Sequence, residues 1–216
     1  MYHVLIILFD DTYIYQEKLR QRAPIQIDLR FMSGTKFMCA FDRLKIIENK
    51  IPPIQSSINF IGKGDYHYVS YIFLKRINEP FVLLVIDNHI DMKYSDKNFI
   101  RCDSWLYNAG LLKNLRQIYY INSQKINKIF KTELPIYLSI DKDIIDNRYL
   151  KTRWTQGTTS PQQLVDFILN IISFNRVIGI DICGEPELII EELKKSEEIN
   201  LSIIECIKTL NFKQSA

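Results

Sequence analysis

The sequence predicts an α/β protein, a three-layer α/β/α fold with a mainly parallel sheet, and three observations support this. Apolar runs typical of buried strands alternate with helical stretches along the chain, as in a parallel sheet between two helix layers. The run Val82–Ile86 has no polar face, as expected of a strand covered on both sides. Three of the runs end in acidic residues, so we expect carboxylates to gather at one edge of the sheet.

The size and composition favour one globular domain spanning residues 1–216. The chain has 216 residues and a formal net charge of +3, which is too balanced to indicate binding to nucleic acid or to an anionic membrane. The four cysteines are far apart in the sequence and form no C-x-x-C motif; this favours reduced thiols in a cytoplasmic protein. The apolar N-terminal stretch is too short to span a bilayer and has no basic residues before it, so we interpret it as the first strand.

The first third of the chain contains two expected strands and one helix. His3–Phe9 is a continuous apolar run, and Ile25–Phe31 alternates apolar and polar residues as a half-exposed strand does. Lys50–Ser57 contains two consecutive prolines and is expected to be a loop. The glycines of Gly62–His67 predict a tight turn that leads into a helix over Tyr68–Lys75.

The rest of the chain continues the alternation. Phe81 opens the central strand after a Glu-Pro break, and Ser160-Pro161 is a favourable helix start, with an N-cap serine and proline at the first helical position. The remaining expected elements are a helix over Ser104–Asn114, strands over Gln117–Ile121, Pro135–Ile140 and Arg176–Ile182, a helix from Pro161 to about Ser173, and an amphipathic helical segment over Leu188–Leu210.

The residues that follow three of the strands have the side chains of a metal site. The expected cluster comprises Asp87, His89, Asp91, Asp141, Asp143 and Glu185, with His67 approaching from the glycine turn. So many carboxylates repel one another unless cations neutralise them. Carboxylates with a few imidazoles suit manganese better than zinc or iron. A single aspartate after a strand is usually a turn or helix cap, but two of the three histidines in the chain lie beside these acids, which favours a site for two cations.

These motifs resemble those of the arginase (ureohydrolase) superfamily. The chain has a glycine turn with a histidine (Gly62–His67), then D-x-H-x-D (Asp87–Asp91), then S-x-D-x-D-x-x-D (Ser139–Asp146), then an acidic residue after a late strand (Asp181–Glu185). The matches occur in the family's order over roughly residues 60–187. Each motif is weak alone, and the D-x-H-x-D and S-x-D-x-D motifs are specific together.

The resemblance implies a dinuclear manganese hydrolase. Asp87 and Asp141 would bridge two Mn²⁺ ions, with His67 and Asp91 completing one site and His89 and Asp143 the other. Such paired metals lower the pKa of a shared water from 15.7 toward roughly 7 and direct its attack on the guanidinium carbon. Asp143 would act as the catalytic acceptor of the water's proton. Glu185 would hold the guanidinium by a charge-assisted hydrogen bond.

Several departures from the family pattern bear on the substrate. Tyr66 is inserted before the histidine of the glycine turn, the last acid is offset by one residue, and a proton-shuttling histidine is absent downstream of Asp91. The chain is shorter than the enzymes that hydrolyse free arginine, and the loops after Asp91 and Asp146 are brief, so the site should be open. The segments Cys102–Trp105 and Trp154–Thr159 are similar to those of a small branch that includes peptide arginases.

Those enzymes perform a post-translational modification in RiPP biosynthesis: they convert arginine residues of ribosomally made precursor peptides to ornithine. We therefore expect an arginine-containing precursor peptide as substrate, contacted by Ser104, Trp154 and Glu185. The alternatives are a ureohydrolase acting on a small free guanidino compound such as arginine or agmatine, a single-zinc deacetylase of the related fold, and a non-catalytic binding protein. Asp91 argues against the deacetylase, because those enzymes lack the third acid of D-x-H-x-D.

Overall fold

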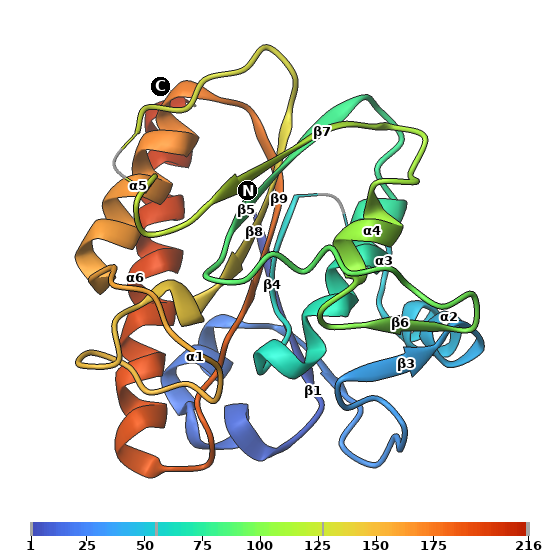
Figure 1. Cartoon of the computed structure of the whole chain (residues 1–216). Helices are drawn as coiled ribbons and strands as arrows, with labels where there is room; N and C mark the ends of the chain where they lie inside the picture. Colours follow the sequence, from blue (N-terminus) through green and yellow to red (C-terminus); the bar gives the residue numbers. More distant parts are fainter. Residues whose placement is uncertain (1, 55, 127, 215–216) are drawn as a thin grey trace.

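The computed structural model describes residues 2–54, 56–126 and 128–214, with side chains as far as Lys208. Its centre is a seven-stranded sheet in the order β2-β1-β4-β9-β8-β5-β7, in which all pairings are parallel (Figure 1). The strands are β1 (His3–Leu8), β2 (Ile25–Asp28), β4 (Ser57–Phe60), β5 (Phe81–Ile86), β7 (Leu115–Ile121), β8 (Ile136–Asp141) and β9 (Val177–Cys183). A small antiparallel pair, β3 (Met38–Ala40) and β6 (Phe99–Arg101), lies outside this sheet.

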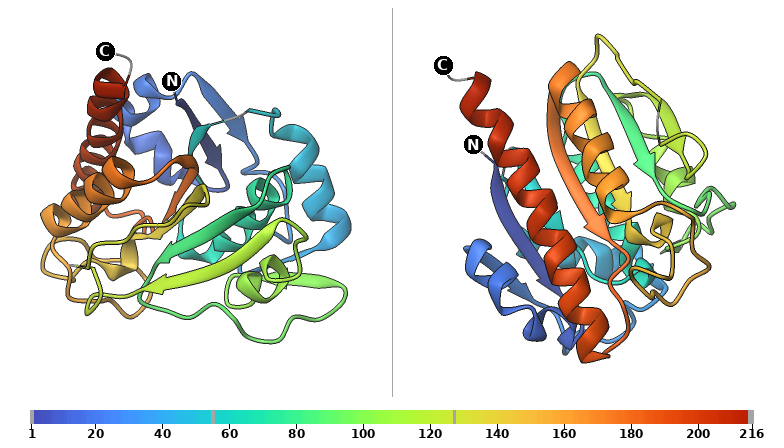
Figure 2. Two further views of the ribbon diagram at one scale, coloured as in Figure 1. Left: turned by 90° about the horizontal axis from the view of Figure 1, so that it is seen from above. Right: turned by 90° about the vertical axis from the view of Figure 1, so that its left-hand side faces the viewer.

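Helices cover both faces of the central sheet, which confirms the predicted three-layer α/β/α architecture. The helices α1 (Glu17–Arg22), α5 (Pro161–Phe174) and α6 (Ile190–Gln214) pack on one face, where α5 and α6 run side by side (Figure 2). The other face carries α2 (Phe41–Lys50), α3 (Ser70–Lys75) and α4 (Trp105–Ala109) (Figure 1). Short 3₁₀ segments complete the chain: η1 (Asp11–Tyr15), η2 (Gly64–Val69) and η3 (Lys142–Ile144).

The two central strands that lead to the acidic motifs are buried along their whole length. All residues of β5 and of β8 are buried, which explains why their apolar runs show no polar alternation.

The helix α5 begins with a capping box. Ser160 accepts a hydrogen bond from the backbone N–H of Gln163 at 3.2 Å, and the Gln163 side chain accepts one from the Ser160 N–H at 2.8 Å. This capping box confirms the helix start predicted at Ser160-Pro161.

Five elements were not predicted, and three expected ones are shorter. The helices α1 and α2 and the strands β3, β4 and β6 were missed. The expected strand over Ile25–Phe31 ends at Asp28. The expected helix over Ser104–Asn114 is a single turn, α4. The expected helix over Tyr68–Lys75 is 3₁₀ up to Val69 and α-helical only from Ser70.

Within the described ranges, no helix is both long and apolar enough to cross a membrane.

Candidate metal centre

The candidate site lies beyond the carboxyl ends of two neighbouring strands. β5 ends at Ile86, immediately before Asp87, and its partner β8 ends at Asp141. Parallel strands present their carboxyl ends at the same edge of a sheet, which is where open α/β folds bind ligands. The two acidic motifs, 54 residues apart in the sequence, therefore meet in space.

His67 reaches this edge through a turn that only glycine accommodates easily. Gly62, directly after β4, has a φ of +96°, in the left-handed region that glycine populates without strain. Gly64 follows, and a Cβ there would lie 3.0 Å from Asp141 Oδ2 and 3.1 Å from the Trp154 ring. The absence of a side chain thus lets the backbone of η2 approach the site closely and brings the His67 ring to Asp141.

One cluster gathers around His67. Its Nδ1 atom lies 3.2 Å from Asp91 Oδ2, 3.4 Å from Asp87 Oδ2 and 3.6 Å from Asp141 Oδ2. His67 is fully buried, and Asp87 and Asp141 nearly so. Three carboxylate oxygens therefore surround the Nδ1 atom of His67.

A second cluster adjoins the first through Asp87. His89 Nδ1 lies 2.6 Å from Asp143 Oδ2 and 3.9 Å from Asp87 Oδ1. Asp143 Oδ1 also accepts a hydrogen bond from the Asn88 backbone N–H at 3.0 Å, which fixes the carboxylate against the loop after β5. Asp87 thus offers one oxygen to each cluster. All six residues predicted as metal ligands, which are His67, Asp87, His89, Asp91, Asp141 and Asp143, are brought together; their role as ligands stays a prediction.

The unpaired atoms of these clusters fit divalent cations. Within the described residues, His67 Nδ1 and Asp87 Oδ2 are buried and have no hydrogen-bond partner, a costly arrangement unless something else binds them. Burial, followed by the charges of Asp143, Asp141 and Asp91, raises the pKa of Asp87 well above its ordinary value. Burial and the charge of Asp143 raise the pKa of Asp141 to about 7. A cation would relieve this repulsion and satisfy the unpaired atoms.

Hydrogen bonds that involve Ser139 and Asp181, on the side of the ring away from the clustered carboxylates, set the tautomer of His67. Ser139 donates its only hydroxyl hydrogen to Asp181 Oδ1 at 2.6 Å, so it accepts from His67 Nε2–H, at 3.0 Å. A neutral His67 ring held in this way presents the lone pair of Nδ1 to the clustered carboxylates, as a metal ligand requires. Without a cation, burial lowers the pKa of His67, but the nearby carboxylate of Asp91 and the charges of Asp141 and Asp181 raise it to about 9. Ser139 and Asp181 belong to the quoted motifs but were not predicted as site residues.

Two further side chains hold the ligand carboxylates in place. The Trp105 indole N–H donates to Asp91 Oδ2 at 3.0 Å, and Cys183 Sγ donates to Asp141 Oδ2 at 3.1 Å. Cys183 is itself close enough to His67 and Asp141 to complete a three-ligand set. However, burial and then the charge of Asp141 raise its pKa well above the usual range. Without a cation it is therefore a thiol that donates its hydrogen to Asp141.

A pocket of about 190 Å³ opens over the clusters. Trp154 lines it and is 37% exposed; its contact with substrate stays a prediction. The Trp154 N–H donates to Asp65 Oδ1 at 3.2 Å, and the ring meets Phe37 edge to face. Asp103 and Lys93 line the pocket as an ion pair, with 3.1 Å between Lys93 Nζ and Asp103 Oδ2.

Glu185 is not in this pocket, which corrects its expected role as the guanidinium ligand. Gly184 has a φ of +79°, and a Cβ there would lie 2.2 Å from Asp141 Oδ1. After this turn, Glu185 is buried against α6, away from the clusters. It forms an ion pair with the buried Lys142, and its oxygens also accept hydrogen bonds from Ser196, Asn200 and Gln16.

Ser104 is also misplaced as a substrate contact. It is fully buried, and its hydroxyl accepts a hydrogen bond from the Arg101 backbone N–H at 3.2 Å. Ser104 therefore shapes the turn before α4 and does not line the pocket.

Comparison with known proteins identifies a relative and a fold. No protein-family model matches the chain. An uncharacterized protein of Thermotoga maritima is 34% identical over 221 residues, covering 95% of this chain and 89% of the relative. The chain belongs to the same family as that protein.

Solved structures show the fold. Entamoeba histolytica arginase, in complex with L-ornithine, superposes with a TM-score of 0.63 at 15% identity, over 96% of this chain and 98% of that chain. Proclavaminate amidino hydrolase from Streptomyces clavuligerus gives a TM-score of 0.64 at 11% identity, over 96% of this chain and 92% of that chain. A T. brucei arginase-like protein gives a TM-score of 0.58 at 13% identity, over 95% of this chain and 91% of that chain. That protein is a triple mutant that gains two aspartates and a histidine, and it is bound with Mn²⁺. The chain therefore has the fold of the arginase-like ureohydrolase superfamily.

Proposed function

We propose that this protein is a dinuclear metal hydrolase that cleaves the guanidinium group of arginine side chains in a peptide, giving ornithine and urea. The observation that carries the proposal is the pair of adjacent ligand clusters that share Asp87, one around His67 and one around His89. Four carboxylates and two imidazoles are a hard donor set that suits manganese. The Mn²⁺ bound by the T. brucei arginase-like mutant that carries added aspartates and a histidine agrees with this choice.

The residues divide into two ligand sets. His67 and Asp91 would hold one ion and His89 and Asp143 the other, with Asp87 and Asp141 between the two sets. When bound, such a pair of cations lowers the pKa of a water toward neutrality and directs its attack on an electron-poor carbon. Ser139 and Trp105 keep His67 and Asp91 in the orientation that this role needs.

The reaction moves one water and redistributes its protons. The water oxygen bonds to the guanidinium carbon, and the bond from that carbon to the side-chain nitrogen breaks. Urea leaves, and the side-chain nitrogen becomes the ammonium group of ornithine, so charge and atoms balance. Asp143 is the carboxylate placed to accept a proton from the water and return it to the leaving nitrogen, because it lines the pocket and is held by His89 and Asn88.

We assign guanidinium binding to Asp103 and not to Glu185. It lines the pocket, and its Oδ2 accepts hydrogen bonds from Lys93 at 3.1 Å and from Arg101 at 3.0 Å. The Lys93 side chain is 73% exposed, so its ion pair is weak and easily exchanged. A substrate guanidinium that displaces Lys93 would gain a charge-assisted hydrogen bond from the same carboxylate.

The surroundings of the pocket support a peptide substrate. Ile90 lines the pocket and exposes 63% of its surface, and Met92 and Tyr94, on the same loop after Asp87, expose 46% and 74%. Phe99 and Tyr107 add further exposed apolar surface nearby, and the Tyr94 and Tyr107 rings meet edge to face. Contiguous exposed apolar side chains mark binding surfaces, and residues flanking an arginine in a peptide would lie against them.

A small free guanidino compound is the second candidate substrate. The names of the structural neighbours favour it, since they include an arginase in complex with L-ornithine and an amidino hydrolase. The two candidates share the metal centre and differ in what contacts the loop after Asp87.

Mass spectrometry of substrates incubated with manganese-loaded protein tests the proposal. Arginine-containing peptides, free arginine and agmatine are run in parallel, and we expect the peptides to lose one CH₂N₂ unit per modified arginine. Asp141→Asn should abolish turnover, whereas Asp146→Asn, at an acid of the same motif that pairs with the exposed Arg148, should retain it. Turnover of free arginine or agmatine alone would reject the peptide substrate, and turnover of none of the three would reject the hydrolase.

A further inference from the structure

Two neighbouring residue pairs of β8 and β9 lie beside the two nitrogens of the His67 ring. Ser139 pairs with Asp181, and two residues further on Asp141 pairs with Cys183, the last residue of β9. Residues two apart on a strand point to the same face of the sheet. Ser139 Oγ lies 3.0 Å from His67 Nε2, and Asp141 Oδ2 lies 3.6 Å from His67 Nδ1. Cys183, the partner of Asp141, is therefore the next side chain beside Nδ1.

The thiol of Cys183 lies among the atoms of the cluster around His67. Its side chain is fully buried, and its Sγ donates to Asp141 Oδ2 at 3.1 Å. One ligand atom from each of Cys183, His67 and Asp141 lies within 4.8 Å of the other two. Zinc bonds of about 2.3 Å to sulfur and about 2.0–2.2 Å to nitrogen and oxygen place ligand atoms roughly 3–4 Å apart. The three residues can therefore share one ion after small movements.

The backbone after β9 keeps the thiol in this place. Gly184 has a φ of +79°, and a Cβ there would lie 2.2 Å from Asp141 Oδ1 and 2.5 Å from the Lys142 backbone nitrogen. This close packing fixes the end of β9 against the end of β8, so Cys183 stays next to Asp141.

The contacts of this thiol differ from those of an ordinary buried cysteine. Buried cysteines usually behave as small apolar side chains, and Cys39 and Cys206 direct their sulfur atoms to backbone carbonyls. Cys183 instead donates to a carboxylate, beside His67 Nδ1, a buried atom that has no hydrogen-bond partner among the described residues. A cation would bind that nitrogen and would replace the thiol hydrogen as the partner of the Asp141 oxygen.

We propose that Cys183 binds the cation held by His67 and Asp141, and that this position therefore takes zinc. A thiolate and an imidazole are ligands that suit zinc better than manganese. The group around His89 offers only an imidazole and carboxylates and so retains its preference for manganese. A thiol that binds a divalent cation is deprotonated, and the hydrogen that Cys183 donates to Asp141 leaves to solvent as one proton. The inference rests on the metal centre of the proposed hydrolase and not on its substrate.

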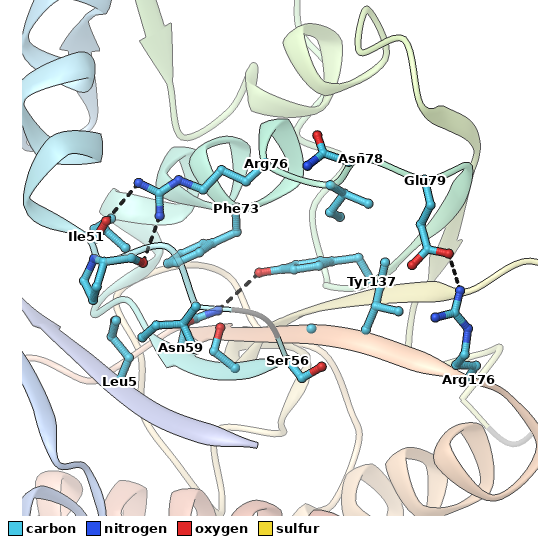
Figure 3. Close-up of a pocket in the computed structure, with 16 residues that line it drawn as sticks. Leu5, Ile51, Ser56, Asn59, Phe73, Arg76, Asn78, Glu79, Tyr137 and Arg176 are labelled. Atoms are coloured by element: carbon cyan, nitrogen blue, oxygen red, sulfur yellow. Dashed lines mark hydrogen bonds and ion pairs between the residues drawn. The ribbon is translucent and has the colours of Figure 1, made fainter. Parts of the chain in front are cut away.

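Added cations have no comparable site elsewhere in the part of the chain that the structure describes. Each of the three groups of residues that could hold a metal ion there includes His67 or His89. A pocket of about 370 Å³ lies at the opposite, amino-terminal edge of the sheet, and the one acid among its described lining residues, Glu79, is paired with Arg176 (Figure 3). Those lining residues include no histidine and no cysteine, so this pocket does not compete for the cation.

Cobalt(II) tests whether sulfur is a ligand. Co²⁺ substitutes for zinc, and its bond to a thiolate gives a strong absorption band in the near ultraviolet. We expect this band when Co²⁺ is added to the metal-free full chain. Cys183→Ser should abolish it, because serine keeps a donor for Asp141 but has no sulfur. Cys102→Ser is the matched control and should retain the band, because Cys102 is buried and lines the pocket over the clusters but belongs to none of the three ligand groups.

Calorimetric titrations with zinc and with manganese separate a ligand from a positioning residue. Cys183→Ser should weaken zinc binding at least tenfold and leave the manganese affinity nearly unchanged, which would also show that the variant is folded. An equal loss of both affinities, or a band that persists in Cys183→Ser, would overturn the proposal. A wild-type protein that binds manganese but shows no cobalt band would refute only the role of Cys183. A wild-type protein that binds none of these cations would refute the metal centre of the proposed function as well.

Discussion

Replacing Asp141 by asparagine should affect stability in opposite directions with and without manganese. Asp141 has a pKa of about 7 in the folded protein against an ordinary value of 3.8, a rise of about three units, worth about 4 kcal/mol in full. Because the pKa is raised, the cost of keeping the carboxylate charged is absent below about pH 4. It grows as the pH rises toward 7 and is complete above it. Water that reaches the site reduces such penalties, so we expect Asp141→Asn to add about 2 kcal/mol to the free energy of unfolding of the metal-free protein at pH 8.

The substitution keeps one of the two hydrogen bonds that Asp141 accepts and loses the one from Cys183 Sγ to Oδ2. The asparagine Oδ1 can still accept the hydrogen bond that the Asp143 backbone N–H donates to Asp141 Oδ1 at 2.9 Å. For a chain of this size, 2 kcal/mol corresponds to a rise in Tm of about 4–8 °C. With manganese the order reverses, because a ligand at 100 times its Kd stabilises the wild type by about 2.7 kcal/mol, and the variant lacks one of the charges that hold the ions.

Thermal unfolding at pH 8, in EDTA and in excess MnCl₂, measures both effects. Asp146→Asn is the control, because Asp146 lies outside the pocket and pairs with the exposed Arg148. Asp146→Asn should show no rise in Tm over the wild type in EDTA, and manganese should raise its Tm as much as it raises that of the wild type. An Asp141→Asn protein that melts at a lower temperature in EDTA and responds to manganese like the wild type would refute the assignment of Asp141 to a repulsive metal cluster.

Three further substitutions separate structural, positioning and binding roles. Glu185→Gln leaves the buried Lys142 without its counter-charge and should cost about 3–5 kcal/mol in denaturant unfolding; normal stability with a raised KM would instead restore Glu185 to the substrate site. Ser139→Ala frees His67 Nε2 and should weaken manganese binding about 10–100-fold by calorimetry, and an affinity equal to that of the exposed control Ser202→Ala would contradict this. Trp154→Ala removes a rim contact and should raise the KM for the peptide about tenfold, or about 1.4 kcal/mol, with kcat unchanged; a fall in kcat at constant KM would assign Trp154 to the chemical step.

The sequence predicted the centre of the fold because its strands are fully buried. In β5 and β8 every residue is buried, so burial alone shapes their composition and leaves an unbroken apolar run. The strand β4 was missed because Asn59 interrupts its apolar pattern, and because it begins at the end of a proline-rich loop. That asparagine is tolerated in the middle of the sheet by hydrogen bonds to Ile180 and Tyr137, residues about 120 and 80 positions away along the chain, and such partners cannot be predicted from local sequence.

The ligand motifs were predictable for a different reason. Asp87, His89 and Asp91 gather although β5 ends at Ile86, so strand alternation does not hold them on one side. Asp87 Oδ1 accepts a hydrogen bond from the His89 backbone N–H at 2.6 Å, and Trp105 and Asp143 hold the other two side chains. The spacing predicted that these side chains lie together, whereas the contacts that produce the geometry come from other segments.

The position of Glu185 shows where pattern matching fails. An acid offset by one residue could still face the site if the chain were flexible there, but the turn at Gly184 packs against Asp141 and Lys142. Gly184, which has no side chain, therefore occupies the position next to Asp141. Glu185, the next residue, is buried against α6. There it neutralises Lys142, which lies between Asp141 and Asp143 in the sequence. Glu185 therefore bears on the clusters only indirectly, by anchoring the segment that carries Asp141 and Asp143.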